Sequence, residues 1–264
     1  MGDRKAVTAG LLGVGLAVLV ASSSHAIDPA KVVDLSHTFD AQTIYWPTDE
    51  KGFRLDVLSE GRTSGGWYYA AKEFETAEHG GTHLDAPIHF AEGKKTADEV
   101  PLSQLIGQLV VIDVTKSAEI DPDYRVSLAD LEGWEKRNGR IPSGAIVVMR
   151  SGWSQRWPDR KKVLGTDVPG DTANLHFPGF SREAAEFLVE ARDVGAIGVD
   201  TPSIDHGPSK DFIVHQVVNG ADKPGLENLA NLESVPEFGA TIIALPMKIG
   251  GGSGAPARVI AILP

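Results

Sequence analysis

The sequence predicts an α+β fold, a single compact domain in which helices flank a mixed β core. Several short apolar runs are typical of strands that are buried on both faces. Only two segments combine a helix start signal with the apolar spacing of an amphipathic helix. So few helices could not cover this many strands in a simple doubly wound sheet. No internal repeat or linker divides the chain of 264 residues, which is long enough for one large domain.

The predicted strands run along the whole chain. The first two are 31–35 and 53–58, with a turn-prone Trp-Pro-Thr-Asp segment at 46–49 between them. Segment 67–74 alternates aromatic and polar residues, so we expect a strand that runs into the histidine cluster described below. Five further apolar runs are predicted as strands buried on both faces: 109–114, 145–150, 196–200, 241–245 and 257–263.

Two serines begin the predicted helices. Ser127 can accept hydrogen bonds from the free N–H groups of a first turn, and Asp130 stands at the distance of a capping box. Ser181 takes the same place in segment 181–191, whose apolar residues recur at helical spacing. The glycine-rich run 250–254 is predicted to be a hairpin loop. It is not a phosphate-binding loop, because the Lys-Ser/Thr pair of that motif does not follow it.

Residues 1–26 are predicted to be a signal peptide, and residues 27–264 the folded domain. Arg4 and Lys5 precede an uncharged apolar run at 6–21, and a small-x-small exit ends at Ala26. A retained membrane anchor is the alternative, although the apolar run is a little short for a span. We therefore expect an exported protein, periplasmic or secreted, with no membrane span after cleavage.

Composition excludes several classes of protein. The formal net charge of −11 argues against a partner that is a nucleic acid, which would demand a basic surface. The chain has no cysteine, so thiolate catalysis and cysteine-ligated zinc are excluded.

The segment from His79 to His89 is the strongest functional signal. It reads HGGTHLDAPIH and holds His79, His83, Asp85 and His89. Imidazole and carboxylate groups are the usual ligands of Zn²⁺ and also suit Mn²⁺. His83, Asp85 and His89 alternate, so an extended segment would direct them to one side, and Pro87 would end a regular strand. The alternative is a polar loop of hydrogen-bonded histidines. A zinc-protease helix is disfavoured, because Gly-Gly-Thr separates His79 from His83.

The same residues resemble a known family. HGGTHLDAPIH is similar to the HxGTHxDxPxH signature of the cyclase-like metal-dependent hydrolases, which include bacterial kynurenine formamidase and isatin hydrolase. Three later segments resemble family segments in the same order: FPGFS with EAAEFL from 177, GVDTPSID at 198–205, and His215 followed by Glu227. The resemblance spans 32–264 and implies a swivelling β/β/α fold.

The resemblance also implies roles for the matching residues. His79, His83 and Asp85 would bind a first metal ion, and a bridging Asp85 with His215 and Glu227 would bind a second. His89 would be the general acid and base, and Glu227 would act in catalysis as well. Isatin hydrolases use one Mn²⁺ and lack the tail glutamate, so Glu227 slightly favours a dinuclear, formamidase-like site holding Zn²⁺ or Mn²⁺. In the alternative, Glu227 only caps a helix and His215 is an ordinary core histidine.

Substrate contacts are predicted less directly. By the same resemblance, Trp46 and Trp67 are candidates for an aromatic pocket wall, as are Tyr68 and Tyr69, although aromatic residues on strands often belong to the core. Ser203 and Asp205 would line the mouth of the site or form a turn beside Pro202. His37, His176 and His206 show no partner spacing and are expected to be bystanders.

The leading hypothesis is a metal-dependent hydrolase that cleaves the C–N bond of an amide, formamide or cyclic amide on a small, aromatic substrate. The alternatives are an exported metal- or ligand-binding protein without catalysis, and a ring-closing cyclase or dehydratase. The resemblance further implies a homodimer or homotetramer.

Overall fold

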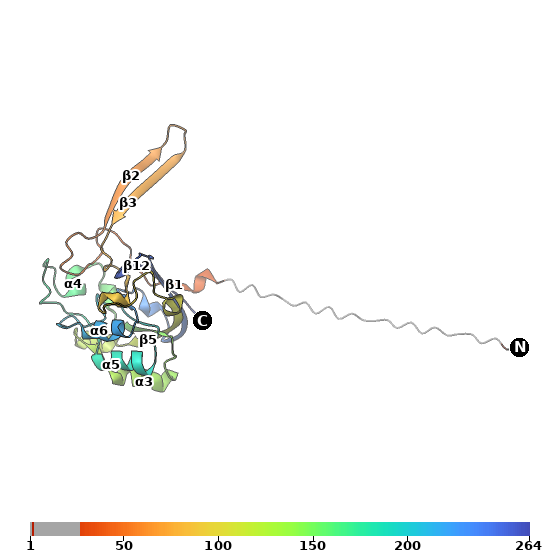
Figure 1. The fold of residues 1–264 in the computed structure, drawn as a ribbon, viewed down its shortest axis with the longest axis vertical. Helices are drawn as coiled ribbons and strands as arrows, with labels where there is room; N and C mark the ends of the chain where they lie inside the picture. The colour runs from red at the N-terminus through yellow and green to blue at the C-terminus, as the bar shows by residue number, and fades with distance from the viewer. Residues whose placement is uncertain (1, 3–26) are drawn as a thin grey trace.

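The computed structural model describes residue 2 and residues 27–264, so the predicted signal peptide lies outside the described part (Figure 1). Eight strands form the main sheet in the order β1-β12-β11-β5-β7-β9-β10-β4, and β4 also pairs with β12. The sheet therefore closes on itself like a barrel. Its strands are β1 Val32–Asp34, β4 His83–Asp85, β5 Ile106–Asp113, β7 Ile146–Arg150, β9 Ala196–Val199, β10 Gly225–Glu227, β11 Phe238–Pro246 and β12 Gly254–Ile262.

The sheet is mixed, as predicted. The pairings β5–β7, β7–β9 and β9–β10 are parallel. All pairings that involve β1, β4, β11 or β12 are antiparallel. Two further strand pairs lie outside the main sheet. They are β2 Arg54–Arg62 with β3 Tyr68–Glu75, and β6 Arg125–Val126 with β8 Gly179–Phe180.

Two apolar cores explain why the parallel strands read as continuous apolar runs. One core lies within the closed sheet and includes Leu84, Val148 and Val259. The other lies between the opposite face and the helices, and includes Val147 and Trp134. Consecutive residues of β5, β7 and β9 enter the two cores alternately, so both faces of these strands are buried, as predicted.

The expectation of two buried faces is wrong for segments 241–245 and 257–263. In β12 the buried residues Ala257, Val259 and Ala261 alternate with exposed or half-buried ones. In β11 the buried residues are Ala240, Ile242 and Ala244, and the residues between them are exposed or half-buried. This strand pairs antiparallel with β12 and β5 and has one face against the core, which produces a period of two.

The capped helices begin where predicted. Ser127 accepts a hydrogen bond from the Asp130 amide and completes a capping box at the start of α3 Leu128–Asn138. Ser181 caps α5 Arg182–Glu186, which continues as a π-helical turn over Phe187–Ala191. The remaining α-helices are α1 Leu102–Leu105, α2 Thr115–Ile120, α4 Arg160–Leu164 and α6 Ile213–Gly220, and the 3₁₀ turns are Pro29–Lys31, Pro87–His89, Trp153–Arg156 and Leu232–Ser234.

Segment 67–74 forms a strand, but the expectation that it runs into the histidine cluster is wrong. Strand β3 pairs with β2 and ends at Glu75, before His79. Together these two strands form a hairpin that projects from the body of the molecule (Figure 1). Within residues 27–264, no helix has the length and apolar character needed to cross a membrane.

Candidate metal centre

The site is built around β4, the short strand that closes the sheet. His83 and Asp85 are two residues apart on this strand, so their side chains lie on one side of it. Pro87 ends the strand as expected, but the segment is not extended as far as His89. A 3₁₀ turn over Pro87–His89 follows instead, and it still brings His89 to the same cavity.

Strand pairing brings Glu227 to the cluster. Strand β10 lies antiparallel to β4, with Glu227 directly opposite His83. Directly opposite residues on one face of such a pair have neighbouring side chains. The Glu227 carboxylate has Oε2 3.4 Å from His83 Nε2 and Oε1 3.3 Å from His215 Nε2. Glu227 therefore lies between two histidines that are 132 residues apart in the sequence.

His215 is positioned by helix α6 and by Asp205. One carboxylate oxygen of Asp205 accepts the Val214 amide at 3.1 Å. The other lies 3.1 Å from the His215 amide and 2.7 Å from its ring Nδ1. Asp205 thus caps the first turn of α6 and orients the ring of His215. The free Nε2 of that ring lies 3.2 Å from Asp85 Oδ2.

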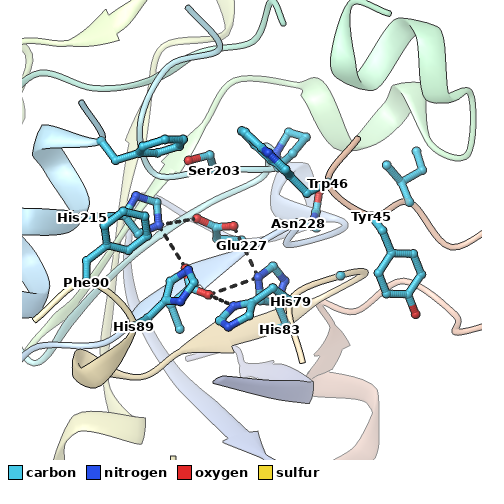
Figure 2. A pocket seen from close by; sticks show the side chains of 15 residues that line it. Tyr45, Trp46, His79, His83, His89, Phe90, Ser203, His215, Glu227 and Asn228 are labelled. Carbon is cyan, nitrogen blue, oxygen red and sulfur yellow. Dashed lines mark hydrogen bonds and ion pairs between the residues drawn. The ribbon is translucent and has the colours of Figure 1, made fainter. Parts of the chain in front are cut away.

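His79 and His89 complete the cluster (Figure 2). His79 Nδ1 lies 2.6 Å from Asp85 Oδ1, and its other ring nitrogen lies 2.9 Å from the Ser253 hydroxyl. The His89 ring stacks on the His79 ring with centroids 3.9 Å apart. All six predicted metal or acid–base residues therefore meet in one place: His79, His83, Asp85, His89, His215 and Glu227.

Two groups of ligand atoms are close enough to hold an ion each. His79, His83 and Asp85 form one group, and Asp85, His89 and His215 form the other, with ligand atoms within 4.8 Å in each. Asp85 belongs to both, as expected of a bridging carboxylate. The second group contains His89, for which we predicted proton transfer rather than ligation. Glu227, which we predicted to bind the second ion, contacts a histidine of each group, His83 and His215.

One atom fits metal ligation especially well. His83 Nδ1 lies 3.0 Å from the Gly81 carbonyl oxygen and donates to it, which leaves Nε2 with a lone pair when the ring is neutral. This Nε2 is buried and has no hydrogen-bond partner in the described part of the chain. It lies between the carboxylates of Asp85 and Glu227, at 3.2 and 3.4 Å. A divalent cation would satisfy all three groups.

Burial and neighbouring charges shift the pKa values of the side chains in the cluster. Burial would raise the pKa of Asp85, but His83, His215 and His79 outweigh burial and hold it well below its usual value. Burial and the neighbouring Asp85 raise the pKa of Glu227. Burial lowers the pKa of His83, yet Asp85 and Glu227 bring it up to about 9. Burial and the surrounding histidines lower the pKa of His89 to about 4, against the pull of Asp85.

The cluster forms one wall of a cavity of about 260 Å³. Trp46 and Ser203 line this cavity, as predicted. The other aromatic wall residues, Tyr45, Phe90 and Phe212, were not predicted. Phe90 directly follows His89, and Phe212 lies three residues before His215. Their closeness in sequence to predicted site residues was therefore a signal that could have identified them.

The prediction that Trp67 lines this cavity is wrong. Trp67 lies at the end of the β2–β3 hairpin next to the turn, where 64% of its surface is exposed, and Tyr68 and Tyr69 are exposed on the same hairpin. The predicted strand is present, but nearly all of its residues are exposed, so its aromatic side chains line neither a pocket nor a core. His37 stacks on Trp157 and His176 pairs with Asp123, and neither lines this cavity.

Comparison with known proteins decides the family. The sequence model of the family described as putative cyclase matches residues 33–206, more than half of the chain. This chain belongs to the putative cyclase family. It is 35% identical over 209 residues to the isatin hydrolase of Roseibium aggregatum, covering 76% of this chain and 78% of that protein.

The similarity of this cyclase-family chain to other proteins extends over most of its length. The kynurenine formamidase of Erythrobacter litoralis is 31% identical, with 87% of this chain and 93% of the relative covered. A crystal structure of an isatin hydrolase bound to the product analogue thioisatinate superposes with a TM-score of 0.80 at 30% identity, covering 89% of this chain and 92% of that chain. The fold and the family suggested by the histidine signature are therefore confirmed.

Proposed function

We propose that this chain is a metal-dependent hydrolase that cleaves the C–N bond of an amide on a small aromatic compound. The observation that carries the proposal is the position of the His–carboxylate cluster, which forms one wall of an aromatic cavity. The relatives named for this chemistry, isatin hydrolase and kynurenine formamidase, are similar over most of the chain.

The cavity favours a neutral cyclic amide over a charged amino acid. Trp46, Phe90 and Phe212 pack against one another at a tilt around it, and such rings suit a flat apolar ligand. Among the described residues that line the cavity, none is lysine or arginine. A free carboxylate on the substrate would therefore have no lysine or arginine to pair with and would depend on the bound ions alone, beside Asp85 and Glu227. An isatin-like substrate needs no such pairing.

The residues present fit one or two divalent ions, Zn²⁺ or Mn²⁺. His79, His83 and Asp85 would hold the first, and Asp85, His215 and Glu227 a second. A bound ion of this kind lowers the pKa of its water from 15.7 to roughly 7 and polarises a carbonyl oxygen. The two neutral acceptors Gly81 O and Ser253 Oγ, together with Asp205, fix the histidines that would ligate it.

His89 is the residue best placed to move a proton. It lines the cavity beside both candidate ion groups, and its low pKa keeps the ring neutral at neutral pH. A neutral imidazole can accept the proton of an attacking water and return it to the leaving nitrogen as the C–N bond breaks. Ser203 also faces the cavity. Its oxygen accepts from the Asp205 amide at 3.2 Å, which leaves the hydroxyl proton free to donate to a substrate carbonyl.

A matched pair of variants tests the proposal. His83→Ala should lose the ion and the activity together, because Nε2 is the ligand atom between both carboxylates. His89→Asn should keep the ion and lose about 10²–10⁴-fold in turnover, the usual contribution of a general acid or base. Metal content would be measured alongside hydrolysis of isatin and of N-formylkynurenine. His176→Ala, an exposed histidine outside the cavity, is the control.

The outcomes also separate the alternatives. If His83→Ala retains both the ion and the activity, the metal-dependent mechanism proposed here is overturned. An ion-loaded wild type that turns over neither amide would favour a metal- or ligand-binding protein without catalysis, and an unchanged turnover in His89→Asn would remove the proton-transfer role from His89. If the chain instead loses water from an open substrate and does not add it to a closed one, the product mass would reveal a cyclase or dehydratase.

We propose, in addition, that the protein is exported and that it works as a homodimer or homotetramer. The basic, then apolar, then small-residue start of the sequence supports export. The apolar side chains of the β2–β3 hairpin support assembly, because Leu55, Val57, Leu58, Trp67 and Phe74 are exposed in the single chain. Mass spectrometry of the protein purified from the cell envelope fraction or the medium would show whether its first residue is Ile27.

A further inference from the structure

The glycine-rich segment 250–254, which leads from the β11–β12 loop into the first residue of β12, lies against the candidate ion site. Gly254 is the register partner of Asp85 in the pairing of β12 with β4. A Cβ atom at Gly254 would lie 2.5 Å from His79 Cε1 and 2.6 Å from the Leu84 carbonyl oxygen. Glycine is therefore required there so that the His79 ring can lie directly on the backbone of this loop.

Ser253 connects His79 to a second carboxylate. Its oxygen lies 2.9 Å from His79 Nε2 and 2.6 Å from Glu78 Oε2. The Ser253 amide also donates to Glu78 Oε2, at 3.0 Å. Glu78 does not reach His79 itself, because its Oε2 is 4.0 Å from Nε2. The hydroxyl of Ser253 is thus the connection between the two side chains.

The direction of these hydrogen bonds follows from counting protons. An ionised carboxylate can only accept, so the single hydroxyl proton of Ser253 goes to Glu78. The Ser253 oxygen must then accept from His79, which places a proton on Nε2. The other nitrogen, Nδ1, faces Asp85 Oδ1 and the first group of candidate ligands. A neutral His79 would therefore present the lone pair of Nδ1 to an ion, whereas His83 and His215 present Nε2.

The loop is held firmly enough to impose this geometry. Asp98 Oδ1 accepts the Gly251 amide at 2.9 Å, and the Ala97 amide donates to the Gly252 carbonyl oxygen at 2.8 Å. The Ser253 carbonyl oxygen accepts the Ala86 amide at 2.9 Å. These contacts connect the loop to the histidine signature itself and to the chain that follows it, so the position of Ser253 follows that of the site.

We propose that Ser253 and Glu78 are positioning residues that fix the tautomer of His79, with the proton on Nε2 and the ligand lone pair on Nδ1. This inference rests on the metal site of the proposed function. It assigns a role to the glycine-rich loop, and it predicts that His79 binds through the opposite ring nitrogen from His83 and His215.

Ser253→Ala tests the proposal. The variant loses the acceptor of Nε2–H, and we expect about 10–100-fold weaker binding of Zn²⁺, the usual cost of removing such a partner. Affinity would be measured by competition with a chelator. The nitrogen-15 spectrum of the His79 ring in the Zn²⁺-loaded wild type should show a protonated Nε2 and a metal-bound Nδ1. Ser143→Ala is the matched control, since the Ser143 hydroxyl lies 3.1 Å from a carboxylate oxygen of Asp193, outside the site.

The possible results distinguish a failure of this inference from a failure of the metal site. Wild-type His79 bound through Nε2, or an unchanged affinity in Ser253→Ala, would overturn this inference and leave the metal site intact. A wild type that binds no divalent ion would overturn the metal site and the inference together. If Ser253→Ala does not fold, Glu78→Ala gives the same information. It frees the serine proton to donate to Nε2, so the Zn²⁺ affinity should fall and the ring signature should change.

Discussion

At the scale of single residues, the cluster shows how neutral and charged acceptors orient histidines. His83 donates to a backbone carbonyl, His215 to a buried carboxylate and His79 to a hydroxyl. A carboxylate acceptor raises the basicity of the ring more than a carbonyl or a hydroxyl does. Among these three histidines, His215 should therefore be the most strongly donating ligand, and Asp205 the partner on which ion affinity depends most.

Asp205→Asn is expected to weaken ion binding by about 10–100-fold, because the amide is a poorer acceptor for His215 Nδ1–H. The side chain keeps its size, so the cap of α6 is disturbed less than by alanine. Titration calorimetry with Zn²⁺ would measure the change. Asp123→Asn is a matched control, since Asp123 accepts from His176 Nδ1 at the similar distance of 2.8 Å in an exposed pair. Equal affinities for the two variants would contradict the prediction.

Chemistry-bearing residues were predictable because their types and spacing are distinctive. Composition and spacing alone predict a metal site at 79–89, and the resemblance added His215 and Glu227. Trp67 shows the limit of such reasoning. An aromatic residue on an alternating strand is compatible with a pocket, a core or an exposed surface, and only the tertiary structure distinguishes them. Phe212 was missed for a similar reason, because nothing in its own identity points to a cavity.

At the scale of elements, strand prediction succeeded where packing agrees with local pattern. The apolar runs of β5, β7 and β9 enter two cores and are buried on both faces. The β2–β3 hairpin follows the strand pattern equally well, yet most of both strands is exposed. Local sequence specifies that these residues form strands. It does not specify what covers them, because that depends on parts of the fold or on partners far away in sequence.

The hairpin is therefore where we expect assembly to depend on single side chains. Replacing Val57 and Leu58 by lysine would put two charges into an apolar contact between chains, which costs several kcal/mol when the charges are unpaired. Light scattering after gel filtration should show a dimer or tetramer for the wild type and a smaller species for the double variant. Ile120→Lys is a suitable control, because Ile120 is 86% exposed and lies away from the hairpin, on α2. A monomeric wild type would refute the expectation.

At the scale of the whole molecule, the site lies where the sheet closes. Strand β4 has only three residues, yet it pairs with β10 on one side and with β12 on the other. Its side chains His83 and Asp85 face Glu227 of β10, His79 from the preceding loop and His215 of α6. Segments from both halves of the sequence therefore meet at one cluster of charges, and an ion held there would connect them.

Ion binding should consequently stabilise the entire domain. A ligand that binds only the folded state adds about 2.7 kcal/mol at a free concentration 100 times its dissociation constant. For a domain of this size that corresponds to a rise in Tm of roughly 5–10 °C. Scanning calorimetry of chelator-treated protein, with and without added Zn²⁺ or Mn²⁺, measures this rise. The His83→Ala variant should show a much smaller one, and His176→Ala the full one. An equal rise in His83→Ala would mean that the stabilising ion binds elsewhere, because that variant has lost the buried Nε2 between Asp85 and Glu227.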